Sequence, residues 1–212
     1  ARDAAVELLT AEPRLCGVWS CSGKPVYGAY GAKWQLLAGK GQLMDMIDGI
    51  PLSLSPASFT QVHPEQTVRL YETVRRFAAL SGRETVFDLY SGIGCIALSM
   101  AGKAKEVIGV ENYAPAAADA ARNAALAGIG NCRFLAEDAA QALPRLAAEN
   151  IQPDVVVLDP PRAGCSEAVI DSVVQAVPQR IVYVSCAPAT LARDVRRFAA
   201  AGYLPQQIQP LD

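Results

Sequence analysis

The sequence is poor in histidine and has no closely spaced cysteine pair. His63 is the single histidine, and no two of the six cysteines form a Cys-x-x-Cys pair. A structural zinc ion takes about four Cys or His ligands at short spacing, so we expect no metal site of this kind. The cysteines are scattered through a chain long enough to bury its own core, and this pattern argues against a disulfide framework.

Long apolar runs and an excess of positive charge are missing too. No apolar run is long enough to span a bilayer, and the N-terminal segment ARDAAVELL carries charges inside its apolar pattern, unlike a signal peptide. We therefore expect a cytoplasmic protein with no membrane partner. The net charge of −2 gives no global support for a nucleic-acid binder. We interpret the arginines at 69–83 and 193–197 as solvated helix faces.

The apolar content is high enough for a sizeable core. The 212 residues are 51% hydrophobic and 19% charged, which suits one ordinary domain with a small addition. In residues 1–60, a short helix at 4–9 precedes short extended runs separated by turn signals at 22–25, 39–41 and 48–51. This pattern predicts a small antiparallel β subdomain. The extended runs are 15–20, 34–37, 42–47 and 52–54.

Residues 61–212 alternate between helix and strand patterns. An amphipathic helix is expected over 64–80, and a last extended piece over 203–209. Between them, helical segments separate five short runs rich in β-branched residues, which predicts an α/β domain with a parallel, doubly wound sheet. The predicted strands are 86–90, 107–111, 132–135, 155–158 and 181–184.

The first two strands of this sheet end in polar or glycine-rich turns. Gly92 and Gly94 let the backbone turn tightly and approach a ligand, although the third glycine of the dinucleotide fingerprint is missing. Asp88 before the glycines disfavours a pyrophosphate and favours a cofactor with a cationic amine. Glu111, about twenty residues later, is placed to accept hydrogen bonds from a ribose diol, or else to cap the next helix.

Two further acids end the third and fourth strands. Asp138 is placed either to contact a cofactor or to cap the helix expected at 139–148. Asp159 is followed by two prolines, which fix an extended backbone and hold the carboxylate stiffly at the strand end. Arg162 fits either an ion pair with Asp159 or a phosphate contact, and both remain open.

The fifth strand ends at a cysteine. In the stretch RIVYVSCAPATLARD, at 180–194, the strand leads into Cys186, and Pro188 sets up a turn before a helix. Cys186 therefore lies at the carboxyl end of a strand, where open α/β sheets bind ligands, and just before a helix N-terminus, which favours a thiolate. The alternative is a buried, inert cysteine.

Taken together, these motifs resemble the RNA uracil-5-methyltransferase family. The segments SFTQVHPEQ, DLYSGIGCIAL, GVE, LDPPRAGC and YVSCAPATLARD occur in that order. The resemblance covers residues 50–212 well and residues 1–50 loosely. It implies a Rossmann-like class I methyltransferase fold and S-adenosyl-L-methionine as cofactor. The implied reaction is the formation of 5-methyluridine in transfer or ribosomal RNA, without an obligate protein partner.

The resemblance also implies roles for individual residues. Cys186 matches the nucleophile, and Asp159 matches a cofactor-contacting position that also faces the target base. Covalent catalysis requires the uridine to leave its stack and enter the pocket. The resemblance and the strand-end argument together give the expected cofactor-binding residues: Gln61, Tyr90, Gly92, Gly94, Glu111, Asp138 and Asp159.

The sequence departs from the family pattern in three places. His63 and Ala187 stand where the family usually has asparagine, and an alanine side chain makes no hydrogen bonds. The glutamate that serves the family as general base lies in a segment that would follow Asp212, so we expect the natural protein to continue. Two other functions stay open: a degenerate methyltransferase fold that acts as an RNA-binding module, and an amine-directed methyltransferase in which Cys186 is structural.

Overall fold

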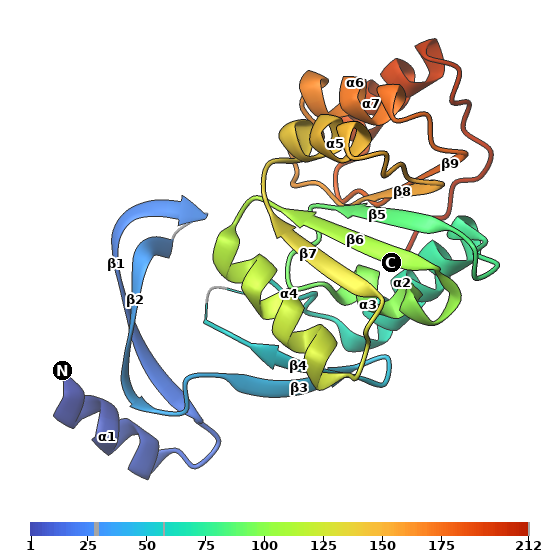
Figure 1. The fold of residues 1–212 in the computed structure, drawn as a ribbon. Coiled ribbons are helices and arrows are strands. Elements are labelled where there is room, and N and C mark those ends of the chain that lie inside the picture. Colours follow the sequence, from blue (N-terminus) through green and yellow to red (C-terminus); the bar gives the residue numbers. More distant parts are fainter. Residues whose placement is uncertain (28–29, 57, 212) are drawn as a thin grey trace.

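The computed structural model describes residues 1–27, 30–56 and 58–211. Its centre is a five-stranded, all-parallel sheet with the strand order β7-β6-β5-β8-β9 (Figure 1). The predicted parallel, doubly wound sheet is confirmed, and every predicted strand in it is found within two residues of its expected ends. The strands are β5 (Thr85–Leu89), β6 (Glu106–Glu111), β7 (Cys132–Ala136), β8 (Val155–Leu158) and β9 (Arg180–Tyr183).

The strand order reverses between β5 and β8. From β5 the chain builds outward through β6 to β7, then returns across the sheet to β8 and β9. All four residues of β8 are buried, as expected for a strand with helices on both faces of its sheet. At such a reversal, the loops that leave neighbouring strands diverge and open a crevice at the carboxyl ends.

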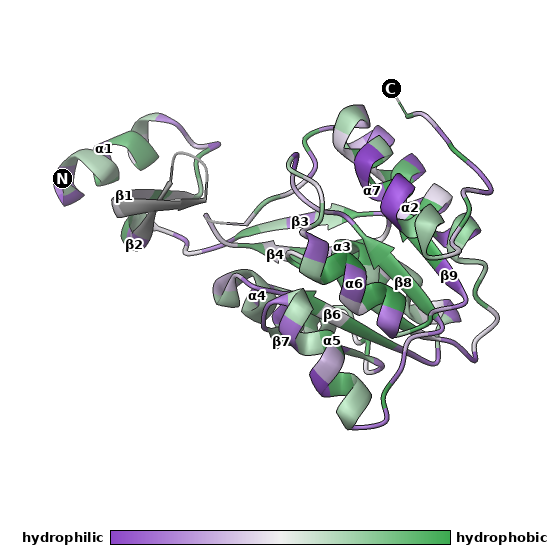
Figure 2. Cartoon of the chain, turned by 90° about the horizontal axis from the view of Figure 1, so that it is seen from above, coloured by the Kyte–Doolittle hydropathy of each residue, from purple (hydrophilic) through white to green (hydrophobic). Residues whose placement is uncertain are grey.

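Helices cover both faces of the sheet and create two apolar clusters. One cluster packs α2 and α3 against the sheet, and the other packs α5, α6 and Phe198 of α7 against the opposite face. Figure 2 shows the hydrophobic strands inside and hydrophilic residues on outer helices such as α7. The helices of this part are α2 (Pro64–Ala78), α3 (Cys95–Met100), η1 (Ala101–Lys103), α4 (Ala114–Leu126), α5 (Ala139–Ala148), α6 (Glu167–Gln175) and α7 (Pro188–Ala200).

Two antiparallel hairpins precede this domain, after the helix α1 (Arg2–Ala11). The hairpin of β1 (Gly17–Tyr27) and β2 (Tyr30–Gly39) is longer than predicted, because β1 passes through the expected turn at 22–25 with register shifts. Figures 1 and 2 show it set apart from the sheet. The second hairpin, of β3 (Leu43–Ile47) and β4 (Ile50–Leu54), packs on the domain instead.

This second hairpin has specific contacts with the helices. Leu52 is buried in the same apolar cluster as α2 and β5. The Ser53 amide donates a 2.8 Å hydrogen bond to the buried Asn123 Oδ1 of α4, and Arg75 of α2 pairs with Asp48 in the turn. Hairpin β3–β4 thus shares the core of residues 61–212, although it lies before the boundary expected near residue 60. That boundary stays a prediction.

The last expected extended piece forms no strand. Residues 203–211 belong to no helix or strand, so the extended piece predicted at 203–209 is not paired into the sheet. Pro205 and Pro210 cannot donate to a strand ladder. Leu204 and Ile208 are 66% and 80% exposed, so a strand here would gain little apolar burial. Among the helices of the described residues, none has the length and apolar character that crossing a membrane requires.

Candidate active site

A cavity of about 2030 Å³ opens at the carboxyl ends of β5, β6, β8 and β9. Its wall combines these strand ends with the start of α2, the start of α7 and the C-terminal residues. Six of the eight residues expected at the site line this one cavity. They are Gln61, Tyr90, Gly92, Glu111, Asp159 and Cys186. The strand-end argument and the family resemblance together therefore predicted a site whose residues lie up to 125 positions apart in the chain.

The glycine loop after β5 has an unusual backbone. Tyr90, Gly92 and Gly94 all have positive φ angles, of 65°, 54° and 87°. A Cβ atom on Gly92 would meet no atom within 4 Å, because this residue faces the open cavity. A Cβ atom on Gly94 would lie 2.8 Å from a ring carbon of Phe134. Gly92 thus exposes backbone to a ligand, while Gly94 allows the helix to pack closely on β7.

Alanine substitutions should separate these two roles. We expect Gly94→Ala to lower the free energy of unfolding by about 3 kcal/mol, since it adds steric overlap to an unfavourable φ. Gly92→Ala adds only the backbone strain, about 1 kcal/mol. Urea denaturation of both variants checks this order, and equal losses would contradict it.

Glu111 fastens the glycine loop to the next helix. Its carboxylate is 6% exposed and accepts hydrogen bonds from the Gly92 amide at 3.0 Å and the Tyr113 amide at 2.8 Å. Tyr113 is the N-cap residue of α4, so part of the expected capping role is observed. A carboxylate has about four lone-pair sites, and these two bonds leave acceptor capacity for a ligand in the cavity.

A second carboxylate lies fully buried beneath the glycine loop. Asp88 Oδ2 accepts a 2.9 Å hydrogen bond from the Ala97 amide of α3, and Oδ1 has no partner among the described residues. Burial raises the pKa of Asp88 well above its ordinary value, and the charges of Asp159 and Glu111 add to this effect. Asp88, Asp159 and Gln61 also line a smaller pocket of about 60 Å³ next to the loop. Three clustered acids favour a cationic ligand at this edge.

Asp159 occupies the wall between the two pockets. Burial at the end of β8 raises its pKa from 3.8 to about 6. Within the described chain, the ion pairs do not include one between Asp159 and Arg162. Arg162 lines the large cavity, so of its two expected roles the phosphate contact fits better.

Asp138 and Gly94 lie outside the cavity lining of the described residues. Asp138 is the N-cap of α5, and its side chain accepts a 2.9 Å hydrogen bond from the Ala140 amide. The capping alternative is therefore observed. Its charge still acts on the nearby Tyr90 hydroxyl, whose pKa is raised chiefly by burial. A cofactor contact by either residue stays a prediction.

Cys186 lies on the short loop between β9 and α7. It is exposed and has a free thiol, so it is not the buried cysteine of the alternative interpretation, while its reactivity stays a prediction. Two short-range hydrogen bonds fix the turn around it. The Ala187 amide donates to Ser185 Oγ at 3.1 Å, and Thr190 Oγ1 donates to the Ala187 carbonyl at 3.0 Å. Helix α7 begins at Pro188, two residues after the thiol. The thiol therefore opens into the cavity just outside a helix N-terminus.

Sequence reasoning missed several residues at this site. Phe59 and Tyr113 line the cavity, and the place of Tyr113 two residues after Glu111 was an available signal. Arg193 is exposed, as expected for the solvated helix face at 193–197, but it also donates hydrogen bonds to the carbonyls of Ala163 and Cys165. Spacing on a helix could not reveal this, because the partners come from a different strand end.

The cavity wall is more basic than the whole chain. Although the net charge is −2, four arginines contribute to the lining, from three different elements and the loop after β8. Such a local excess of positive charge suits a polyanionic ligand even when the global charge does not. These residues are Arg76, Arg162, Arg180 and Arg196.

Comparisons with known proteins agree with this geometry. Residues 52–204 match the family model described as tRNA (uracil-5-)-methyltransferase. An RNA methyltransferase of Halalkalibacterium halodurans is 46% identical over 183 residues, which cover 86% of this chain and 40% of the relative. One of Geobacter sulfurreducens is 49% identical over 170 residues, which cover 80% and 34%. The chain thus spans about 40% of the length of the curated relatives it matches.

A solved structure matches the fold over nearly the whole chain. The tRNA (uracil-54, C5)-methyltransferase of Pyrococcus abyssi, in complex with S-adenosyl-L-homocysteine, superposes with a TM-score of 0.70 at 25% sequence identity. The match covers 89% of this chain and 46% of that protein.

Proposed function

Because the chain belongs to the tRNA (uracil-5-)-methyltransferase family, we propose that it forms the catalytic part of an S-adenosyl-L-methionine-dependent RNA methyltransferase. The target is carbon 5 of a uridine in transfer or ribosomal RNA. One observation carries this proposal: the exposed thiol of Cys186 and the carboxylates of Glu111 and Asp159 line the same cavity. This reaction needs a nucleophile and a cofactor pocket at the same edge of the sheet.

The residues around the glycine loop suit the cofactor. When bound, S-adenosyl-L-methionine supplies a methyl group on a positively charged sulfur. Asp159, with a pKa of about 6, is ionised at neutral pH and gives the pocket negative charge to offer a cation. The Oδ1 atom of Asp88, which has no partner among the described residues, lies in the same pocket and adds an acceptor. Glu111 has acceptor capacity for a ribose diol. Gln61, Tyr90 and the open backbone of Gly92 complete the wall that would hold the cofactor.

Cys186 performs the covalent step. Its thiolate adds to carbon 6 of the uracil ring, and the electrons of the carbon 5–carbon 6 double bond move toward the carbonyl oxygen at carbon 4. Carbon 5 of this enolate is electron-rich enough to accept the methyl group, whose bond to the cofactor sulfur would break and leave a neutral thioether. A base then removes the proton from carbon 5, the double bond forms again, and the sulfur leaves as thiolate. The enzyme is thus returned unchanged.

The arginines of the cavity wall suit the RNA. A uridine reaches a buried pocket only after it leaves its stack or loop, and its flanking phosphates then lie at the pocket mouth. Arg162 and Arg196 are both exposed there, on the loop after β8 and on α7. They account for RNA binding by an acidic chain.

A trapping experiment tests the proposal. Full-length protein is incubated with S-adenosyl-L-methionine and RNA that contains 5-fluorouridine, whose carbon 5 carries no removable proton after methylation. We expect a covalent protein–RNA complex that survives denaturing gel electrophoresis and that maps to Cys186 by mass spectrometry. Cofactor binding without any adduct would instead support the RNA-binding module or the amine-directed enzyme.

A further inference from the structure

We propose that Asp194 of α7 is a positioning residue that holds the loop carrying Asp159 against the loop carrying Cys186. This inference rests on the proposed function, and it assigns the Arg-Asp pair at 193–194 a part in the reaction. Asp194 lies outside the cavity lining of the described residues, so it would act through the residues it binds.

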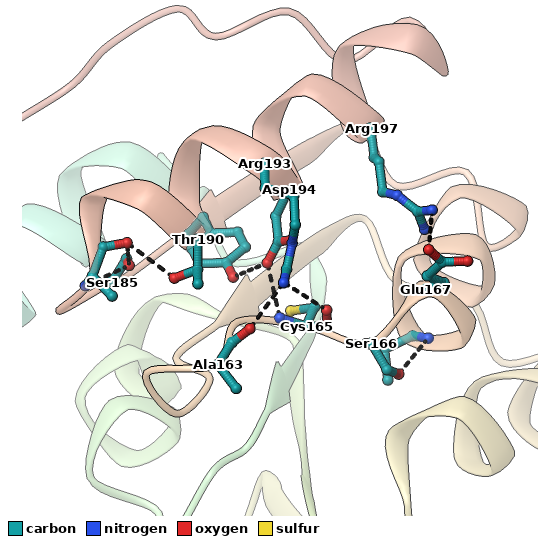
Figure 3. A network of polar contacts seen from close by, with 12 residues as sticks. Ala163, Cys165, Ser166, Glu167, Ser185, Thr190, Arg193, Asp194 and Arg197 are labelled. Atoms are coloured by element: carbon teal, nitrogen blue, oxygen red, sulfur yellow. Dashed lines mark hydrogen bonds and ion pairs between the residues drawn. The ribbon is translucent and has the colours of Figure 1, made fainter.

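Asp194 is a fully buried carboxylate with several donors. It is 0% exposed, and its Oδ2 accepts hydrogen bonds from the Tyr183 hydroxyl at 2.6 Å and from the Cys165 amide at 2.8 Å. Its Oδ1 accepts from Arg193 Nε at 2.8 Å. A buried charge is tolerated only when it is paired and hydrogen-bonded. We call Tyr183, Cys165, Arg193 and Asp194 the Asp194 network (Figure 3).

The network fastens the loop that follows Asp159. Arg193 Nη2 donates to the carbonyls of Ala163 at 2.9 Å and Cys165 at 3.2 Å. One turn earlier, the Thr190 hydroxyl shares its single proton between the Arg162 carbonyl at 3.1 Å and the Ala187 carbonyl at 3.0 Å. Figure 3 shows these side chains on one face of α7, turned toward residues 163–165. Side chains of helix α7 therefore hold the backbone of this loop at three residues, 162, 163 and 165.

Gly164 allows the close approach of loop and helix. It has a φ of +75°, and a Cβ atom there would lie 2.5 Å from Asp194 Oδ2 and 2.6 Å from Arg193 Nη2. The carboxylate and the guanidinium thus occupy the space that any other side chain at 164 would need. The contact between α7 and the loop at 163–165 is therefore specific, because it requires a glycine at position 164.

The same network reaches the cofactor side of the cavity. The Cys165 thiol lies near the hydroxyls of Tyr183 and Tyr90, close enough to help raise the pKa of each tyrosine above its ordinary value, which burial raises most. Tyr90 lines the cavity next to the glycine loop, and Tyr183 is the last residue of β9, three positions before Cys186. Asp194 therefore connects the ends of β5, β8 and β9, which carry the three parts of the proposed site.

The charge state of Asp194 supports this role. Burial pushes its pKa upward, but the hydrogen bonds from its three donors outweigh burial and hold the pKa below the ordinary value. The carboxylate consequently stays ionised at neutral pH and accepts all of these bonds. Asparagine keeps the shape of the side chain, but its amide nitrogen is a donor and accepts no hydrogen bond. It would face groups of the network that are donors themselves.

The experiment compares two variants with a matched control. Asp194→Asn disrupts the network, and Tyr183→Phe removes one hydroxyl while keeping the packing. Arg197→Gln is the control, since Arg197 lies on the same helix but pairs with Glu167 of α6 (Figure 3). Each full-length protein is assayed for the rate of adduct formation with 5-fluorouridine RNA, for cofactor affinity, and for hydrogen exchange of residues 160–165.

For Asp194→Asn we expect adduct formation to slow by about 100-fold, since small misplacements of reacting groups have effects of this size. Cofactor affinity should change by less than about 3-fold, and exchange at 160–165 should accelerate. Tyr183→Phe should give the same pattern with a smaller loss, and Arg197→Gln should leave all three readouts unchanged. The split between rate and affinity marks positioning, because general destabilisation would weaken both.

Two results would overturn the proposal. One is unchanged exchange at 160–165 in both variants, which would mean that the network does not hold the loop. The other is accelerated exchange with an unchanged adduct rate, which would make the network purely structural. If the wild-type protein forms no adduct at all, the proposed function and with it the catalytic role of the network fail, while exchange still reports whether Asp194 holds the loop.

Discussion

Cys186→Ser is expected to abolish methylation while leaving the fold and cofactor affinity intact. A serine hydroxyl does not ionise at neutral pH unless a base activates it, so it cannot add to carbon 6 as a thiolate does. Removal of a nucleophile that acts in concert with its surroundings costs about 10,000-fold or more in rate. We therefore expect no detectable adduct, and at least that loss in single-turnover methylation with radiolabelled cofactor.

The matched control is Cys16→Ser. Cys16 is a half-buried free cysteine just before β1, and it lies outside the cavity lining of the described residues. We expect this variant to methylate RNA within about 2-fold of the wild-type rate, as for other substitutions away from a site. Methylation that persists in Cys186→Ser but is lost in Cys16→Ser would refute the assignment of the nucleophile.

The sheet could be predicted from sequence because its signals are local. Each strand of the sheet is a short run of β-branched or other apolar residues, such as Val155–Leu158, bounded by turns or helices. Hairpin β1–β2 was harder, since Gly23 and Pro25 are turn residues in most contexts yet lie here in a strand with shifted register. What decides such a case is pairing with the residues of β2, and the pattern of the run at 17–27 does not contain that pairing by itself.

The site followed from the sequence only in part, and for the same reason. Cys186, Asp159 and Glu111 could be found because each directly follows a strand, and parallel strands end at one edge. Asp194 could not be found in this way. It lies in the middle of a helix, where an acid is usually solvated, and it is buried because Tyr183 and Cys165 reach it from two strand ends.

Asp159→Asn should make the protein more stable and less active. In the folded state, burial raises the pKa of Asp159 from 3.8 to about 6. Between about pH 4 and 6 the folded state therefore binds more protons than the unfolded state, so stability falls as pH rises through this window. Above it the buried charge keeps its full cost, on the order of 3 kcal/mol, which the neutral amide avoids.

The activity should change in the opposite direction. The Asp159 carboxylate lies beside the pocket where a cationic cofactor would bind, and a neutral amide offers that cation no compensating charge. We expect methylation to slow by about 100-fold or more, as when one preorganised electrostatic group is removed. The thermal stabilisation produced by cofactor should shrink as well, because only the charged residue gains a partner on binding.

Unfolding experiments across pH separate this explanation from ordinary destabilisation. In urea denaturation at neutral pH, Asp159→Asn should have a higher free energy of unfolding than the wild type. This difference should vanish near pH 4. The control is Asp171→Asn on the exposed face of α6, where we expect a change within about 0.5 kcal/mol at either pH. A variant less stable than wild type at neutral pH would show that Asp159 is held by structural hydrogen bonds. A variant that is more stable and less active would instead show that the fold keeps a costly buried charge at this position because a bound ligand needs it.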